Sequence, residues 1–213
     1  MSFARSRLST CILVCFALSA CDESDLPDNG GPPAYPSARH GLRDLVVTPG
    51  STVIALSAPD LLVAYKDDQR LAWTHRLPPN QPVIAAPVVS ADSTTFVLTA
   101  RQLRALAPNG ELKYSVTLPF DGQKPASKSS SPVRHSLVVL PDSSAVVADG
   151  ERTLICVRGG KIVWRHALPA PAKMTARPVA GPNGSVYVRT SAWIYCVGHQ
   201  GALRWRVPLR SPR

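Results

Sequence analysis

An aromatic residue closes four similar phrases of this chain, and its spacing constrains the fold more than any other feature. The phrases are Leu71-Ala72-Trp73, Leu112-Lys113-Tyr114, Ile162-Val163-Trp164 and Leu203-Arg204-Trp205. The aromatics follow one another at intervals of 41, 50 and 41 residues. A period of this length is typical of repeated supersecondary units, each of which relies on its neighbours to cover its apolar face.

Each repeated unit is predicted to hold four short strands joined by tight turns. In the clearest unit, residues 185–190 alternate in the way of a half-buried strand, and turn residues such as Pro182-Asn183-Gly184 separate the strands. The second unit superposes on the fourth at a constant offset of 91, which places Pro87 on Pro178 and Ala105 on Cys196. The units cover about residues 44–77, 87–118, 132–168 and 178–209. The sequence therefore predicts an all-β fold, a β-propeller of about four blades with four antiparallel strands each.

The repeated phrase, a strand followed by a glycine-containing turn and then Leu-x-Trp, resembles the pyrroloquinoline-quinone (PQQ) type of β-propeller repeat. The resemblance covers residues 45–209. This family includes quinoprotein dehydrogenases and envelope lipoproteins such as the scaffold of the outer-membrane β-barrel assembly machinery. It implies that the closing aromatics Trp73, Tyr114, Trp164 and Trp205 pack between blades and that the glycine permits the preceding turn.

Four blades are at the low end of what can close into a ring. The chain could form a small closed ring, two copies could complete an eight-bladed ring as a homodimer, or the propeller could be partial. An open array would present bare apolar blade faces, which proteins rarely tolerate. This argument favours a compact or self-associating form.

The first residues have the parts of an export signal. Arg5 and Arg7 precede an apolar run over residues 8–20, which is too short to span a bilayer. The run ends in Leu18-Ser19-Ala20-Cys21, which resembles the bacterial lipobox. The resemblance implies that residues 1–20 are removed and that Cys21 is lipidated, which would anchor the protein in a membrane. The alternative is an ordinary secretory signal with a cysteine at its cleavage site.

Residues 21–40 are acidic and rich in glycine and proline, as expected of a tether, and residues 41–213 are expected to be the folded domain. That domain holds 21 of the 24 Lys+Arg and 10 of the 14 Asp+Glu, a net charge of +11. An exported protein does not meet nucleic acid, so the charge favours anionic lipid, a polyanionic sugar or an acidic protein as partner, or serves solubility alone.

Two cysteines belong to the domain, Cys156 and Cys196. They occupy the same place in consecutive units, where the earlier units have Ala64 and Ala105, so the position requires a small residue. Equivalent positions in neighbouring blades usually lie farther apart than the roughly 7 Å that a disulfide spans. We therefore expect two buried free thiols rather than a bridge.

No arrangement of residues in the sequence indicates catalysis. The family's quinoproteins use a catalytic Asp, a calcium ion and adjacent cysteines, and the mature chain has no adjacent cysteines, so neither PQQ nor calcium is expected. His75 and His166 both follow a closing Trp by two residues, and we expect them to be surface histidines rather than metal ligands. Asp92, Asp142 and Asn183 are expected to cap turns, with calcium binding as the alternative.

These observations predict a non-catalytic, lipid-anchored β-propeller that faces the periplasm or the cell exterior and binds other envelope proteins. The loop at residues 123–131 is the expected variable contact. The alternatives are a PQQ-binding or other small-molecule module related to quinoproteins and a degenerate propeller fragment.

Overall fold

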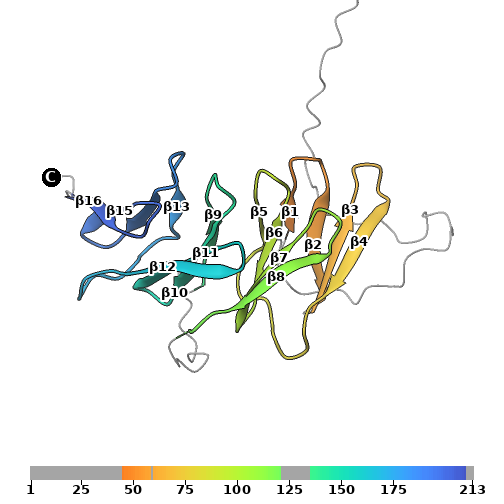
Figure 1. The fold of residues 1–213 in the computed structure, drawn as a ribbon, viewed down its shortest axis with the longest axis horizontal. Helices are drawn as coiled ribbons and strands as arrows, with labels where there is room; N and C mark the ends of the chain where they lie inside the picture. Colours follow the sequence, from red (N-terminus) through yellow and green to blue (C-terminus); the bar gives the residue numbers. More distant parts are fainter. Residues whose placement is uncertain (1–44, 59, 121–134, 210–213) are drawn as a thin grey trace, which may run out of the picture. The chain divides into compact units, whose positions relative to one another are not determined.

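The computed structural model describes residues 45–58, 60–120 and 135–209. These residues form sixteen β-strands arranged as four separate four-stranded sheets (Figure 1). The described residues lie within the compact unit Ser37–Arg213. They include no helix with the length and hydrophobicity that crossing a membrane would require. The prediction of an all-β fold built from repeated four-stranded blades is therefore confirmed.

Each blade consists of four consecutive strands, and every strand pairs antiparallel with the next one along the chain. Blade 1 contains β1 (Leu45–Val47), β2 (Val53–Ala58), β3 (Leu61–Tyr65) and β4 (Leu71–Arg76). Blade 2 contains β5 (Val88–Val89), β6 (Thr95–Leu98), β7 (Gln102–Leu106) and β8 (Leu112–Thr117). Blade 3 contains β9 (Leu137–Val139), β10 (Ala145–Asp149), β11 (Thr153–Arg158) and β12 (Lys161–Ala167). Blade 4 contains β13 (Val179–Ala180), β14 (Val186–Arg189), β15 (Trp193–Val197) and β16 (Leu203–Pro208).

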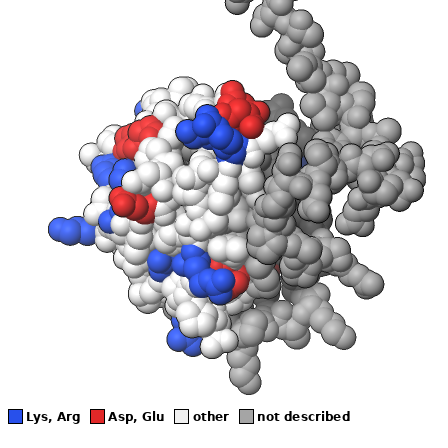
Figure 2. Space-filling view, turned by 90° about the vertical axis from the view of Figure 1, so that its right-hand side faces the viewer, with Lys and Arg blue, Asp and Glu red and all other residues white. Residues whose placement is uncertain are grey.

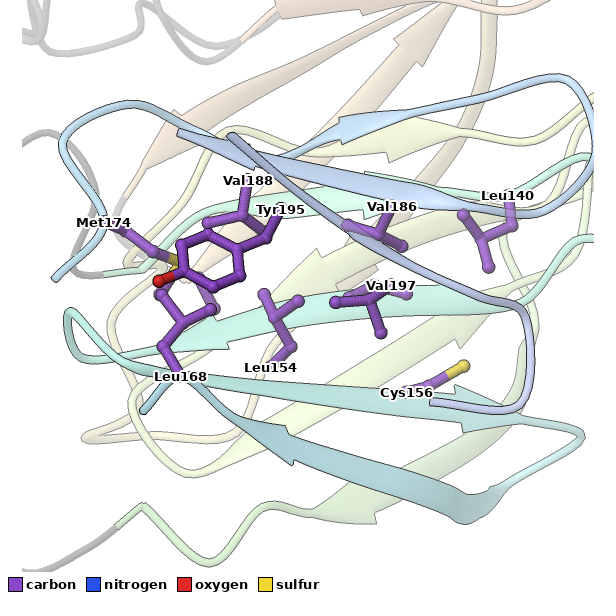
Figure 3. Close-up of a cluster of buried hydrophobic side chains, with 11 residues drawn as sticks. Leu140, Leu154, Cys156, Leu168, Met174, Val186, Val188, Tyr195 and Val197 are labelled. Atoms are coloured by element: carbon purple, nitrogen blue, oxygen red, sulfur yellow. The ribbon is translucent and has the colours of Figure 1, made fainter. Parts of the chain in front are cut away.

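The hydrophobic core lies between blades rather than within one. Three clusters of buried side chains join blade 1 to blade 2, blade 2 to blade 3, and blade 3 to blade 4. Figure 3 shows the last of these, in which Leu154 and Cys156 of blade 3 face Tyr195 and Val197 of blade 4. Among the described residues no such cluster joins blade 4 back to blade 1, so these four blades form a partial propeller instead of a closed ring.

Each blade has the same irregularity at its outer strand pair. A register shift follows a small buried residue in the third strand: Ala64, Ala105, Cys156 and Cys196. Each of these small residues is paired across the strands with the closing aromatic of its own blade. Cross-strand partners point to the same face of a sheet, so a small residue there leaves room for the large ring beside it. Cys156 and Cys196 are free, as expected.

Candidate functional site

The outer strand of each of the first three blades contacts a turn of the following blade. Trp73 of blade 1 lies against Gly110 of blade 2 so closely that a Cβ built on that glycine would be 2.5 Å from Trp73 Cδ2. The indole Nε1 of Trp73 donates a hydrogen bond of 2.9 Å to the carbonyl oxygen of Pro108. The glycine has a φ of +84°, in the left-handed region that residues with a Cβ rarely adopt.

The same contact recurs farther along the chain. Trp164 of blade 3 lies against Gly201 of blade 4, where a Cβ would be 2.7 Å from Trp164 Cγ, and its Nε1 donates to the carbonyl oxygen of His199 at 2.8 Å. Tyr114 of blade 2 contacts Gly160 of blade 3 less tightly, with a Cβ of that glycine placed 3.4 Å away. The aromatic residue and the glycine together therefore determine how one blade packs against the next.

In each blade, the closing aromatic and its cross-strand neighbours form a row of four side chains, which we call the docking row. In the first three blades this row faces the next blade. It comprises one residue from each strand: Val46, Ile54, Ala64 and Trp73 in blade 1; Val88, Phe96, Ala105 and Tyr114 in blade 2; Val138, Val146, Cys156 and Trp164 in blade 3; Val179, Tyr187, Cys196 and Trp205 in blade 4. The first three rows belong to the three inter-blade clusters. The row of blade 4 belongs to none of them.

The docking row of blade 4 is partly open to solvent. Trp205 is 45% exposed and Val179 is 61% exposed, whereas Tyr187 is half-buried and Cys196 is 1% exposed. The Trp205 ring lies 5.9 Å from the ring of Tyr187 in the same blade. The expectation that every closing aromatic packs between blades therefore holds for Trp73, Tyr114 and Trp164 and does not hold for Trp205.

The expectation that His75 and His166 are surface histidines was wrong. Each extends the contact of its closing Trp: Nδ1 of His75 donates to the carbonyl oxygen of Gly110 at 3.0 Å, and Nδ1 of His166 donates to that of Gly201 at 2.8 Å. The Nε2 atom of each ring is buried without a hydrogen-bond partner. Burial lowers the pKa of His75 below its ordinary value of 6.5, and the positive charge of Arg104 lowers it further. Packing between blades thus accounts for both rings.

The predicted turn residues Asp92 and Asp142 stabilise the turn between the first two strands of their blades by accepting hydrogen bonds within it. Asp92 accepts hydrogen bonds from the backbone N–H and the hydroxyl of Thr94 and from the hydroxyl of Ser90. The Ser90 bond is the main cause that lowers the pKa of Asp92 to about 2. Asp142 accepts from the backbone N–H of Ser144 in the same way. Within the described parts of the chain, no three His, Cys, Asp or Glu side chains lie close enough to hold a metal ion.

A hollow of about 280 Å³ lies where the turns after the first strands of blades 2, 3 and 4 meet. Its lining residues are Val89, Ser90, Ala91, Val139, Leu140, Pro141, Ala180, Gly181 and Pro182. The lining contains no ionisable side chain, so it offers no acid, base or charged ligand for chemistry. Its volume is at the low end for small-molecule sites.

The basic charge of the domain is not gathered into one area on the face shown in Figure 2, where Lys and Arg groups lie beside Asp and Glu. Several exposed basic groups have local partners. Arg70 pairs with Asp68 and Arg76 with Asp60, and Arg206 lies 4.7 Å over the ring of Trp193. Exposed pairs of this kind contribute little to stability, and they reduce the area of free positive charge.

Several predicted features lie outside the described residues. These are Cys21, the signal and tether at residues 1–40, and the loop at residues 123–131. One residue that sequence reasoning missed is Gln69, which lies in the turn before β4 with a φ of +65°. Its position two residues before Leu71 matches that of Gly110 before Leu112 and Gly201 before Leu203, a signal that was available from the alignment of the units.

Several solved structures have a similar fold, and their chains are longer than this one. BamB from Moraxella catarrhalis has a TM-score of 0.56 and 14% identity, with coverage of 78% of this chain and 49% of that chain. A streptogramin B lyase has a TM-score of 0.54 and 15% identity, with coverage of 79% and 54%. The Pan2 WD40 domain of Neurospora crassa has a TM-score of 0.51 and 10% identity, with coverage of 78% and 49%. The chain thus spans about half the length of the structures it resembles, and at these identities the likeness concerns the fold.

No match to the chain was found among curated proteins. Residues 24–172 match the PQQ_2 family, which is described as outer membrane protein assembly factor BamB. The matched range includes the first three blades. It contains both residues of the Trp73–Gly110 and Tyr114–Gly160 contacts, and Trp164 but not Gly201 of the third contact. Because the match extends over more than half of the sequence, the chain belongs to the PQQ_2 family of the outer membrane protein assembly factor BamB.

Proposed function

We propose that this protein is a non-catalytic, lipid-anchored β-propeller of the bacterial cell envelope that binds other envelope proteins. The observation that carries the proposal is exposed apolar surface on the described blades, where Trp205 is 45% and Val179 is 61% exposed to water. Contiguous exposed apolar surface on a folded protein usually marks a site for another protein or a membrane. Aromatic side chains such as Trp are also enriched among the residues that dominate protein–protein binding energy.

The comparisons support this proposal at the level of family and fold. The family description names an assembly factor of the outer membrane, which favours an envelope location and a role in contact with other proteins. A similar fold, with a TM-score of 0.53 and 18% identity, occurs in BBS1N, whose structure was solved in complex with ARL6DN. The streptogramin B lyase shares the fold as well, so the non-catalytic part of the proposal rests on the side chains.

The side chains of the described residues favour binding over catalysis. The hollow beside blades 2, 3 and 4 carries no ionisable group, and the acids Asp92 and Asp142 accept hydrogen bonds from their own turns. An acid engaged by its turn and held at a pKa of about 2, as Asp92 is, makes a poor general base near neutral pH. We therefore propose that the protein functions without PQQ or calcium.

The membrane anchor is tested by labelling cells with an alkyne fatty acid. The expected result is labelled protein in the membrane fraction, and loss of both the label and the membrane association in Cys21→Ser. Label on the Cys21→Ser variant would contradict lipidation at that residue. An unlabelled wild-type protein would favour the ordinary secretory signal.

Protein binding is tested in cells with a photoreactive amino acid placed at exposed positions of several blades. Specific crosslinks to envelope proteins are expected, and their absence at every position would contradict a scaffold. Native mass spectrometry with added PQQ and calcium tests the alternative class. A stoichiometric adduct would place the protein among cofactor binders, whereas an unchanged mass is the expected result.

A further inference from the structure

The contacts of blade 1 with blade 2, of blade 2 with blade 3 and of blade 3 with blade 4, which we call the first, second and third joints, differ at two equivalent positions. One position lies two residues after the closing aromatic, on the outer strand. The other lies one residue before the small buried position, on the third strand of the following blade. The two positions hold His75 and Arg104 in the first joint, Val116 and Ile155 in the second, and His166 and Tyr195 in the third. The first joint therefore combines a histidine with a fixed positive charge.

Arg104 points from blade 2 toward blade 1. It is paired with Val97 on β6, and cross-strand partners point to the same face of a sheet. Val97 belongs to the buried cluster that joins blade 1 to blade 2. Arg104 is only 8% exposed, so its side chain is largely buried in the first joint.

Little compensates the burial of this guanidinium. Its Nη1 donates to Oε1 of Gln102 at 3.3 Å, and its Nε is buried without a hydrogen-bond partner. Among the residues that the structure describes, no carboxylate forms an ion pair with Arg104. Burial accordingly lowers the pKa of Arg104 below its ordinary value. A buried positive charge without a partner is costly, so the first joint is sensitive to any further positive charge.

His75 is the second ionisable group of the first joint. Its Nδ1 donates to the carbonyl oxygen of Gly110, and its Nε2 is buried without a partner. Burial lowers the pKa of this ring, and the charge of Arg104 reaches the ring and lowers it further. Protonation adds a positive charge beside Arg104 and leaves a buried N–H without an acceptor. Both effects favour separation of the two blades.

The other charged groups near the joint do not offset this repulsion. Lys113 lies on the same face of blade 2 as Ser115, the partner of Arg104, and is itself positive, with Asp92 at 3.8 Å. Glu111, in the turn that accepts the histidine hydrogen bond, is exposed. Within the described residues, that hydrogen bond is the one interaction that favours the protonated ring.

We propose that the first joint is acid-sensitive: protonation of His75 beside Arg104 separates blade 1 from blade 2, while the third joint stays closed. His166 makes the equivalent hydrogen bond in the third joint, but the residue in place of Arg104 is the uncharged Tyr195. Titration of a histidine between packed elements is a general basis for pH-dependent contacts. Separation exposes Trp73 and the rest of the docking row of blade 1.

The direction of the effect follows from where the proton binds more tightly. In the closed joint the pKa of His75 is lowered, whereas in the open joint it returns to about its ordinary value of 6.5. The proton therefore favours the open joint. The joint is fully stable above pH 6.5 and loses stability as the pH falls toward the lower pKa of the closed form.

The first joint also has the least apolar packing to resist separation. Among the described residues, its buried cluster holds six side chains, and the clusters of the second and third joints hold eleven each. Because buried apolar area is the main favourable contribution to such contacts, a given repulsion has its largest effect on the first joint.

Two thiols at equivalent places test the proposal within one protein. Ala64 is buried in the docking row of blade 1, paired with its closing aromatic as Cys156 is in blade 3. Ala64→Cys is therefore a substitution that another blade of the chain already has. The full-length Ala64→Cys protein in detergent is labelled at pH 7.5 and pH 5.0 with a pyridyl disulfide, which reacts with thiols at acid pH. Peptide mass spectrometry measures both rates, and their ratio removes the effect of pH on the reagent.

The thiol introduced by Ala64→Cys is expected to react about tenfold faster relative to Cys156 at pH 5.0 than at pH 7.5, since one unit of pKa difference corresponds to a factor of ten in opening. Arg104→Tyr reproduces the residue of the third joint, and His75→Gln keeps a hydrogen-bond donor. Each is expected to abolish this change. His166→Gln is the matched control and is expected to leave the change intact.

An unchanged ratio in the Ala64→Cys protein would overturn the proposal. A change that persists in His75→Gln or in Arg104→Tyr would overturn it as well, because the opening would then not come from this pair. Circular dichroism at pH 7.5 establishes that each variant is folded. The comparison of the two thiols needs neither variant, so it decides the proposal even where a variant does not fold.

Discussion

At the scale of single residues, the glycines of this chain have two distinct roles. Gly159 has a φ of +54° with no atom within 4 Å of where its Cβ would be, so its role is conformational. Gly201 has a φ of +82° and also lies under the Trp164 ring. The first role requires a left-handed backbone, and the second requires the absence of a side chain.

Alanine at these two positions separates the two roles. Gly159→Ala is expected to destabilise the fold by about 1 kcal/mol, which is the strain of a left-handed non-glycine residue. Gly201→Ala adds the displacement of an aromatic ring and is expected to lose about 3 kcal/mol. Urea unfolding of both variants measures the difference. Equal losses would show that the indole contact contributes nothing beyond backbone conformation.

His75 gives the fold a dependence on pH. Its pKa is lowered in the folded state by burial and by Arg104, so the folded protein binds the proton more weakly than the unfolded chain. Stability is therefore fully present above pH 6.5 and falls as the pH drops below that value toward the lower pKa of the folded state. Urea unfolding at pH 8 and pH 5 is expected to show a larger loss for wild type than for His75→Gln. Identical losses would contradict this assignment.

At the scale of elements, the outer strands are equivalent in sequence and different in environment. β12 contacts the turn of blade 4 through Trp164 and His166, whereas all six residues of β16 are exposed. The same Leu-x-Trp phrase is thus packed against a following blade in one strand and exposed in the other. Only the presence of a following blade decides between these roles.

This difference predicts unequal effects of removing the two indoles. Trp164→Ala is expected to lose about 3 kcal/mol, because it removes a packed ring and a hydrogen bond to His199. Trp205→Ala is expected to lose less than about 1 kcal/mol, since its ring is 45% exposed. Thermal or urea unfolding distinguishes them. A loss for Trp205→Ala as large as that for Trp164→Ala would mean that the row of blade 4 is already covered in solution.

The reactivity of the Cys156 and Cys196 thiols also tests the packing of the outer strands, because each cysteine is paired with the closing aromatic of its blade. Burial raises the pKa of Cys156 to about 11, and both Cys156 and Cys196 are at most 1% exposed. Neither is expected to react with iodoacetamide at neutral pH until the protein unfolds. In Trp205→Ala, Cys196 loses the ring beside it and is expected to become the faster of the two, with Cys156 as the internal control. Mass spectrometry of the labelled peptides measures both rates, and equal rates in the variant would contradict the arrangement.

At the scale of the whole molecule, stability is distributed along a row of blades. Blades 2 and 3 belong to two inter-blade clusters each, and blades 1 and 4 belong to one each. In an array of this kind, stability is approximately a sum of the units and of the contacts between neighbours. The central blades are therefore expected to open less often than the terminal ones.

Hydrogen–deuterium exchange tests this distribution. The amides of β7 and β11 are expected to exchange slowest, and those of β16 fastest, with the rate difference set by local opening. Uniform protection through all four blades would instead indicate one cooperative unit. A protected β16 would indicate that its face is covered by another chain.

Much of the local structure was predictable from the residues. The strand phrases and the recurring small position at Ala64, Ala105, Cys156 and Cys196 follow from local geometry, and the structure has them where the sequence placed them. The interpretation of His75 and His166 failed because a residue on an outer strand appears solvated when its blade is considered alone.

The sequence by itself determined the blade: the periodicity of apolar residues, the turn residues and the small residue beneath each aromatic are interactions within about 40 residues. It also determined the family, because the repeated phrase resides in those same units. Only the tertiary structure decided which apolar faces are covered. Burial of a blade face depends on the presence and shape of a second blade, and Trp164 and Trp205 have the same local sequence but different neighbours.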